Sequence, residues 1–155
     1  MKVTTVNKTI AVSGGFDPIH VGHVRMIQEA AEYGDVVVIL NTDQWLIDKK
    51  GYVFMPWQER AEIISAIKGV TRIIDTGADT DGSVCNTLRH LDDQISLDFF
   101  ANGGDRYETN TPEMDVCKEL NIKMLWNIGG GKIQSSSDLV DKSRYGKRRV
   151  NGIEL

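Results

Sequence analysis

The chain is poor in cysteine, carries no excess of positive charge and contains no long apolar run. Its two cysteines, Cys85 and Cys117, are too few for a disulfide framework or a zinc cluster. The longest apolar run covers residues 36–40, far short of the roughly 18 residues that a membrane span needs. A formal net charge of −4 argues against a general nucleic-acid binder. We therefore expect a reduced, cytoplasmic protein with no nucleic-acid or membrane partner.

The chain does contain a regular alternation of short apolar runs and segments of helical periodicity, and its 155 residues suit one domain. The predicted strands cover residues 9–13, 36–40, 72–74, 97–101 and 122–126. The first predicted helix has His20 and His23 in its first turn. The other predicted helices cover residues 56–68, 84–92, 112–120 and 135–141. This alternation predicts an α/β fold: a single doubly wound, Rossmann-like, five-stranded parallel sheet with helices on both faces.

The most informative segment lies between the first predicted strand and the first predicted helix. It reads Gly14-Gly15-Phe16-Asp17-Pro18-Ile19-His20-Val21-Gly22-His23. His20 and His23 are three residues apart, so they share one face of the first helical turn. Backbone N–H groups and the positive end of the helix dipole lie at the same place, and glycine allows a ligand close approach. The segment is suited to holding phosphates, although two histidines that only cap a helix are the alternative.

This segment resembles the His-x-Gly-His signature of the nucleotidyltransferase superfamily, which includes cytidylyltransferases and adenylyltransferases. The resemblance covers about residues 9–142 and implies a nucleotidyltransferase domain over residues 1–142, followed by a basic tail over 143–155. The tail could be a solvated end, a phosphate-binding addition or a dimer contact. The resemblance implies catalytic roles for His20 and His23. It implies nucleotide-binding roles for their neighbours, which are Gly14, Gly15, Phe16, Asp17 and Gly22.

Three basic residues form the second candidate group. Lys49 and Lys50 fall in a predicted loop, where the resemblance implies a mobile lysine that reaches a triphosphate; either lysine could serve, and a solvated loop is the alternative. Arg60 precedes isoleucines by three, four and seven residues and so belongs to an inward-facing stripe. An arginine there needs an anionic partner. The resemblance implies a phosphate, and a salt bridge to a core carboxylate is the alternative.

Two glycine-containing segments follow the fourth and fifth predicted strands and therefore reach the ligand-binding edge of the sheet. Residues 102–106 resemble a Gly-Gly-Asp segment of sugar-phosphate adenylyltransferases and glycerol-phosphate cytidylyltransferases, which implies nucleotide binding by Gly103, Asp105 and Arg106. Residues 129–137 are no P-loop, because Trp126 stands where its first glycine would be. They resemble the family's Ile-Ser-Ser/Thr-Thr motif.

The serine-rich motif implies nucleotide binding by four consecutive residues, which are Gln134, Ser135, Ser136 and Ser137. Serine side chains that face a helix N-terminus can also serve only as helix caps.

The residues around the signature include no paired carboxylates and no Ser-His-Asp arrangement, so positioning and charge neutralisation must supply catalysis. The resemblance implies that an ionised acceptor phosphate attacks the α-phosphorus of CTP or ATP and releases pyrophosphate. It also implies Mg²⁺, a small phosphorylated acceptor such as glycerol 3-phosphate, and a homodimer. The alternatives are adenylyl transfer to a sugar phosphate or phosphopantetheine, and a nucleotide-binding sensor without turnover.

Overall fold

The computed structural model describes residues 7–76, 79, 82–103, 111–130 and 134–144, and the backbone of two short strands near the C-terminus. Five parallel strands form one sheet in the order β3-β2-β1-β4-β5. They are β1 (Thr9–Gly14), β2 (Asp35–Leu40), β3 (Val70–Asp75), β4 (Phe99–Ala101) and β5 (Lys123–Leu125). With β1 in the centre, the order reverses there, as in a doubly wound sheet, and the predicted fold class is confirmed.

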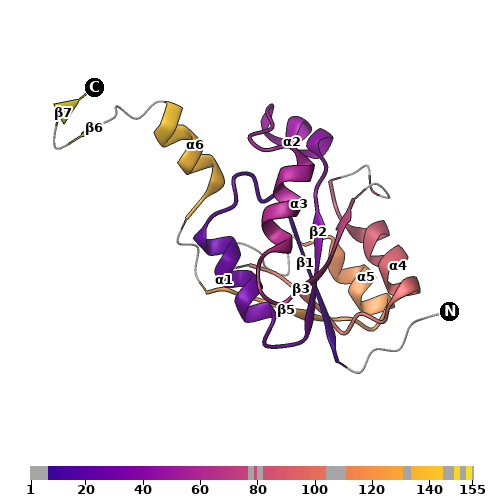
Figure 1. Cartoon of the computed structure of the whole chain (residues 1–155). Coiled ribbons are helices and arrows are strands. Elements are labelled where there is room, and N and C mark those ends of the chain that lie inside the picture. Colours follow the sequence, from indigo (N-terminus) through magenta and orange to yellow (C-terminus); the bar gives the residue numbers. More distant parts are fainter. Residues whose placement is uncertain are drawn as a thin grey trace.

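Six helices lie among the described residues. They are α1 (Val21–Ala30), α2 (Asp43–Lys50), α3 (Trp57–Ser65), α4 (Cys85–Gln94), α5 (Glu113–Glu119) and α6 (Ser136–Arg144). Helices α1 and α3 cover one face of the sheet, and α4 and α5 cover the other (Figure 1). A two-stranded antiparallel sheet of β6 (Arg149–Val150) and β7 (Ile153–Glu154) lies in the region predicted as a tail. The division of the chain at residue 142 stays a prediction.

The core consists of two apolar layers, one on each face of the sheet. Successive residues of a strand point to opposite faces, so Ile10 packs with α1 and α3 while Ala11 packs with α4 and α5. The apolar run of β2 has the same cause, since both of its faces are covered and it offers no solvent side for polar residues. Because all five strands are parallel, their carboxyl ends lie at the same edge of the sheet, between these two layers.

The structure corrects the predicted loop at Lys49 and Lys50, which form the last turn of α2. Helix α2 has almost no apolar stripe, so hydrophobic periodicity could not predict it. Its caps did give a sign. The Thr42 hydroxyl accepts a hydrogen bond from the Trp45 N–H (3.1 Å), and Gly51 ends the helix at φ +85°. The other predicted helices and strands exist, with ends that differ by at most three residues.

Among the residues that the structure describes, no helix is long and apolar enough to cross a membrane. Cys85 and Cys117 are not disulfide-bonded. Burial raises the pKa of Cys117 to about 12, with smaller contributions from Glu113 and Cys85, so this thiol stays protonated near neutral pH. It is therefore no candidate nucleophile.

Candidate active site

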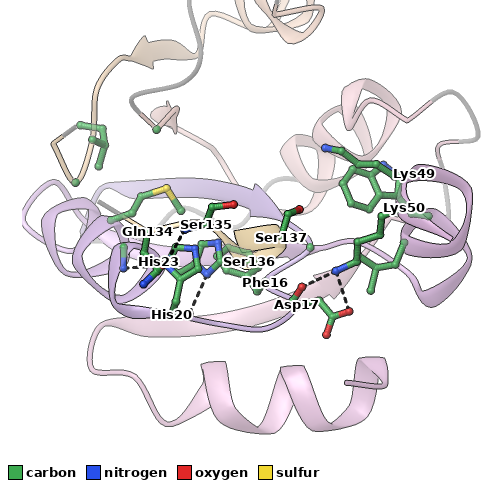
Figure 2. A pocket seen from close by; sticks show the side chains of 18 of the residues that line it. Phe16, Asp17, His20, His23, Lys49, Lys50, Gln134, Ser135, Ser136 and Ser137 are labelled. Atoms are coloured by element: carbon green, nitrogen blue, oxygen red, sulfur yellow. Dashed lines mark hydrogen bonds and ion pairs between the residues drawn. The ribbon is translucent and has the colours of Figure 1, made fainter. Parts of the chain in front are cut away.

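A cavity of about 310 Å³ lies at the carboxyl edge of the sheet, beside the end of β1. The β1–α1 turn, α2 and the segments after β4 and β5 line it (Figure 2). Most of the predicted site residues meet there, namely Gly15, Phe16, Asp17, His20, Gly22, His23, Lys49, Lys50, Gly103, Gln134, Ser135, Ser136 and Ser137. Gly14 and Arg60 are not part of this lining. Asp105 and Arg106 lie outside the described residues.

His20 and His23 cap the start of α1 reciprocally. The Gly22 N–H donates to Nδ1 of His20 (3.1 Å), and the His20 N–H donates to Nδ1 of His23 (3.2 Å). The two imidazoles stack with their centroids 3.8 Å apart. An Nδ1 that accepts a hydrogen bond carries no proton, so each neutral ring has its N–H at Nε2. The capping that the sequence allowed as an alternative is present, and it also fixes the tautomer of both rings.

The pKa of His23 is lowered to about 3 by burial and by the neighbouring His20, so this ring is neutral near pH 7. Phe16 contributes to that burial, since its ring packs edge-on against His23 with centroids 4.8 Å apart. Phe16 is itself buried and has φ +51°, a backbone conformation that non-glycine residues seldom adopt. The turn thus holds a neutral hydrogen-bond donor on the cavity wall.

Asp17 points into the protein. Its carboxylate accepts hydrogen bonds from the N–H groups of Phe54 (2.7 Å) and Met55 (2.6 Å) and pairs with Nζ of Lys50 (3.3 Å). Nζ of Lys50 also donates to the Asp17 carbonyl (2.5 Å). Figure 2 shows this pair at the end of the cavity away from the histidines. Asp17 therefore fixes the α2–α3 connection against the β1–α1 turn.

The two adjacent lysines have different surroundings. Lys50 is held by Asp17, and its ammonium lies 4.7 Å from the centroid of the Tyr52 ring. The ammonium of Lys49 lies 4.6 Å from the centroid of the Trp45 ring, on the cavity wall. Both lysines line the cavity, and the ammonium of Lys50 is committed to Asp17 in this structure.

Arg60 is fully buried behind the cavity wall. Its guanidinium donates at 2.8 Å to the carbonyls of Gly15, Asn41 and Met55 and pairs with the Asp43 carboxylate at 2.6 Å. The salt bridge that the sequence left as an alternative is the arrangement in the structure, although Asp43 is half-exposed and stands at the start of α2. Arg60 thus joins the ends of β1 and β2 to α2.

The serine-rich segment both lines the cavity and holds its own position. The Ser136 hydroxyl donates to the Pro18 carbonyl (2.7 Å), and the Ser135 hydroxyl accepts from the Asp138 N–H (3.3 Å) at the start of α6. The capping alternative therefore applies to Ser135. Ser136 ties α6 to the β1–α1 turn.

The sequence missed part of the lining. The additional residues are mostly apolar or glycine, namely Met26, Trp45, Leu46, Ile128, Gly129 and Gly130. Trp45 and Leu46 lie four residues before Lys49 and Lys50, so recognising the caps of α2 would have placed all four on adjoining faces. A mixed cavity of this kind suits a ligand with phosphates at one end and an apolar or aromatic group at the other.

Comparison with known proteins gives the following matches. The cytidylyltransferase-like family model matches residues 11–128. The bifunctional protein HldE of Syntrophotalea carbinolica is 34% identical over 151 residues, which cover 95% of this chain and 26% of that protein. The ethanolamine-phosphate cytidylyltransferase of Dictyostelium discoideum is 30% identical over 106 residues, which cover 66% of this chain and 28% of that protein. The chain thus spans about a quarter of the length of these relatives.

Two solved structures share the fold at low identity. A lipopolysaccharide core biosynthesis protein from Thermoplasma volcanium matches with a TM-score of 0.61 and 21% identity, over 77% of this chain and 95% of that one. A putative nicotinate-nucleotide adenylyltransferase from Vibrio parahaemolyticus matches with a TM-score of 0.59 and 16% identity, over 91% of this chain and 90% of that one. These matches support the architecture of the sheet and its helices.

Proposed function

The chain belongs to the cytidylyltransferase-like family of nucleotidyltransferases, and from this premise we propose that it transfers a nucleoside monophosphate from CTP or ATP to a small phosphorylated acceptor. Glycerol 3-phosphate is the first acceptor to test. The observation that carries the proposal is the stacked pair of His20 and His23 at the N-terminus of α1, on the wall of the cavity. The name of the ethanolamine-phosphate cytidylyltransferase supports both CTP and a phosphorylated acceptor.

The proposed chemistry uses the histidines as neutral donors. An acceptor phosphate oxygen attacks the α-phosphorus, the bond from the α-phosphorus to the bridging oxygen breaks, and pyrophosphate leaves with that oxygen. The Nε2–H groups of His20 and His23 donate to phosphate oxygens as charge develops, and the N-terminus of α1 adds its dipole. The ammonium of Lys49 neutralises the departing phosphates. The acceptor phosphate is already ionised, so no general base is needed.

We propose Mg²⁺ as a companion of the triphosphate and not as a resident ion. Both carboxylate oxygens of Asp17 are occupied by backbone N–H groups, and one of them also pairs with Lys50. Within the described part of the chain, no three His, Cys, Asp or Glu residues are grouped so that they could hold a metal ion. An ion that binds mainly to phosphate oxygens and water needs no such group.

We also propose a cytoplasmic homodimer. The apolar side chains of Ile47, Phe54 and Ile63 on α2, the α2–α3 connection and α3 are 42–56% exposed, which supports a contact there. The mass of the protein in solution at micromolar concentration tests this part of the proposal, and a monomer would contradict it.

The activity is tested by a coupled pyrophosphate assay. CTP and ATP are each combined with matched acceptor pairs, such as glycerol 3-phosphate and glycerol, with Mg²⁺ or with EDTA. We expect pyrophosphate only from the phosphorylated member of a pair. Equal rates from both members would show that the nucleophile is a hydroxyl and would contradict the mechanism.

The same assay separates the two alternative functions. Release from ATP with a sugar 1-phosphate, and not with CTP, would favour the sugar-phosphate adenylyltransferases that residues 102–106 resemble. Nucleotide binding without pyrophosphate release from any acceptor would favour a sensor.

A further inference from the structure

We propose that Glu29 is a positioning residue that sets the affinity of the cavity for the nucleotide by holding the glycine turn after β5 against α1. The inference rests on the proposed function, because it assumes that the cavity binds a nucleoside triphosphate. Glu29 lies in the last turn of α1, whereas the two histidines stand at the first turn. It is not part of the cavity lining and acts through Gly129.

The turn is closed by its own hydrogen bond, from the Gly130 N–H to the Asn127 carbonyl (3.2 Å), and it is held against α1 by one charged hydrogen bond and one close backbone contact. The Gly129 N–H donates to Oε2 of Glu29 at 2.8 Å. Gly129 has φ +89°, and a Cβ at this position would stand 2.9 Å from Cα of Met26. No side chain fits there, so the turn lies directly on the backbone of α1. Gly129, Gly130 and Met26 all line the cavity, and this backbone contact therefore fixes part of the cavity wall.

The same stretch of chain is tied to the β1–α1 unit a second time. The Ser136 hydroxyl donates to the Pro18 carbonyl at 2.7 Å. The Glu29–Gly129 bond holds the start of this stretch near the C-terminal end of α1, and the Ser136–Pro18 bond holds its end near the N-terminal end. The wall formed by the residues after β5 is therefore located relative to the histidines by two contacts, one at each end of α1.

The glycine turn needs the Glu29 bond for its position, because the hydrogen bond between Gly130 and Asn127 closes the turn and does not tie it to α1. Gly129 and Gly130 both adopt positive φ, at +89° and +80°. A glycine in this region has many alternative conformations, and ordering it costs more entropy than ordering any other residue. A carboxylate that accepts a hydrogen bond from a backbone N–H forms a strong, charge-assisted bond, and this bond selects one of the conformations open to the glycine. Without the bond, a bound nucleotide would itself have to fix the turn against α1, and this ordering cost weakens binding.

The experiment compares two substitutions of similar size. Glu29→Leu removes the acceptor, whereas Glu29→Gln removes the charge and keeps an acceptor oxygen. Glu32→Leu, at an exposed glutamate three residues further on, removes the same charge as a control. We measure equilibrium binding of CTP and ATP, the KM for triphosphate and for acceptor, kcat, and hydrogen exchange at the Gly129 amide.

We expect Glu29→Leu to weaken binding of the triphosphate about tenfold and to raise its KM equally, with kcat and the acceptor KM nearly unchanged. Exchange at the Gly129 amide should accelerate by a similar factor. Glu29→Gln should keep most of the triphosphate affinity and most of the protection of the Gly129 amide. Glu32→Leu should behave as the wild type. A loss shared equally by kcat, both KM values and the melting temperature would indicate a general structural role and would overturn the inference.

Two outcomes separate this inference from the proposed function. If wild-type protein binds the triphosphate and Glu29→Leu binds it equally well, the inference is overturned and the proposed function stands. If wild-type protein binds neither CTP nor ATP, the proposed function and this inference are both overturned. Unchanged exchange at Gly129 in Glu29→Leu would also overturn the inference, whatever the kinetics.

Discussion

The segments that follow β1 and β2 both carry the basic side chains that the sequence singled out, and they use them in opposite ways. After β1, the imidazoles of His20 and His23 stand on the cavity wall, with Nδ1 engaged by the backbone. After β2, Lys50 pairs with Asp17, and Arg60 is turned inward to Asp43 and three backbone carbonyls. The histidines of the first segment face the cavity, whereas Lys50 and Arg60 of the second connect the parts of the protein that surround it.

The difference follows from how each charge is compensated. A buried guanidinium is stable only when hydrogen bonds and an opposite charge surround it, and the protein supplies both for Arg60. The neutral ring of His23 needs no counter-charge, so its side chain can lie on the cavity wall without an acidic partner. A basic residue in a sequence motif therefore does not by itself indicate contact with phosphate.

The largest effect is expected at the histidines. His20→Ala and His23→Ala should each reduce kcat by about 10²–10³, because each removes a donor to the developing charge. The melting temperature should fall only modestly, since each also removes a helix cap. Steady-state kinetics and thermal unfolding measure both effects. Activity like that of the wild type in both variants would contradict the assignment of these residues.

Arg60 tests the other side of the comparison. Arg60→Ala should reduce the free energy of unfolding by about 3 kcal/mol, because buried carbonyls and the Asp43 carboxylate lose their partner. Arg60→Lys should recover only part of it, since a lysine lacks the planar fork. Chemical denaturation measures the loss, with exposed Arg25→Ala as the control. Unchanged stability of Arg60→Ala together with a raised KM for triphosphate would contradict this interpretation and indicate that Arg60 binds phosphate.

The adjacent lysines provide a sharper comparison within α2. Lys49→Met should raise the KM for triphosphate about tenfold, because the cavity loses a cation, while stability changes little. Lys50→Met should mainly lower the melting temperature, because Asp17 loses its counter-charge. Parallel kinetics and unfolding of the two variants decide between them. The reverse pattern would assign the phosphate contact to Lys50.

Gly15 tests how tightly α2 packs on the β1–α1 turn. A Cβ at this position would stand 2.9 Å from Cδ2 of Leu46 and 3.2 Å from Cζ3 of Trp45. We expect Gly15→Ala to cost about 1–2 kcal/mol through overpacking. In a double-mutant cycle with Leu46→Val, part of that cost should disappear. Strict additivity of the two substitutions would show that the alanine is accommodated without this contact.

The smallest effect near neutral pH concerns the protonation of His23, which matters only on acidification. The pKa of His23 is lowered from 6.5 to about 3 in the folded protein, so below pH 6.5 the unfolded chain binds a proton that the folded protein does not. Above pH 6.5 this group has no effect on the free energy of unfolding. As the pH falls from 6.5 toward 3, protonation of the unfolded chain progressively lowers that free energy. His23→Gln should flatten the pH dependence of the melting temperature in this window. An identical pH dependence in both proteins would contradict the neutral state of His23.

The sequence was sufficient to predict the sheet and the histidine turn because their signals are local. The run at residues 36–40 and the spacing of His20 and His23 each lie within a few residues. The directions of Lys50 and Arg60 could not be predicted in this way. Apart from the Met55 carbonyl, the hydrogen-bond and ion-pair partners described for them stand 17–45 residues away along the chain, and only the packed sheet brings them together. Helix α2 was missed for a different reason, since its capping residues were present and its periodicity was not.

The two bonds that hold the wall after β5 also bear on how the protein acquires its site during folding. They join residues 100 and 118 positions apart in the sequence, so they can form only after synthesis has passed residues 129 and 136. Contacts of such long separation close slowly, because the loop entropy is lost before they form. A nascent chain that ends before β5 would already contain both histidines and yet lack the seven lining residues that follow β5. The proposed ability to hold a nucleotide should therefore appear only after residues 129–136 have been synthesised and packed against α1.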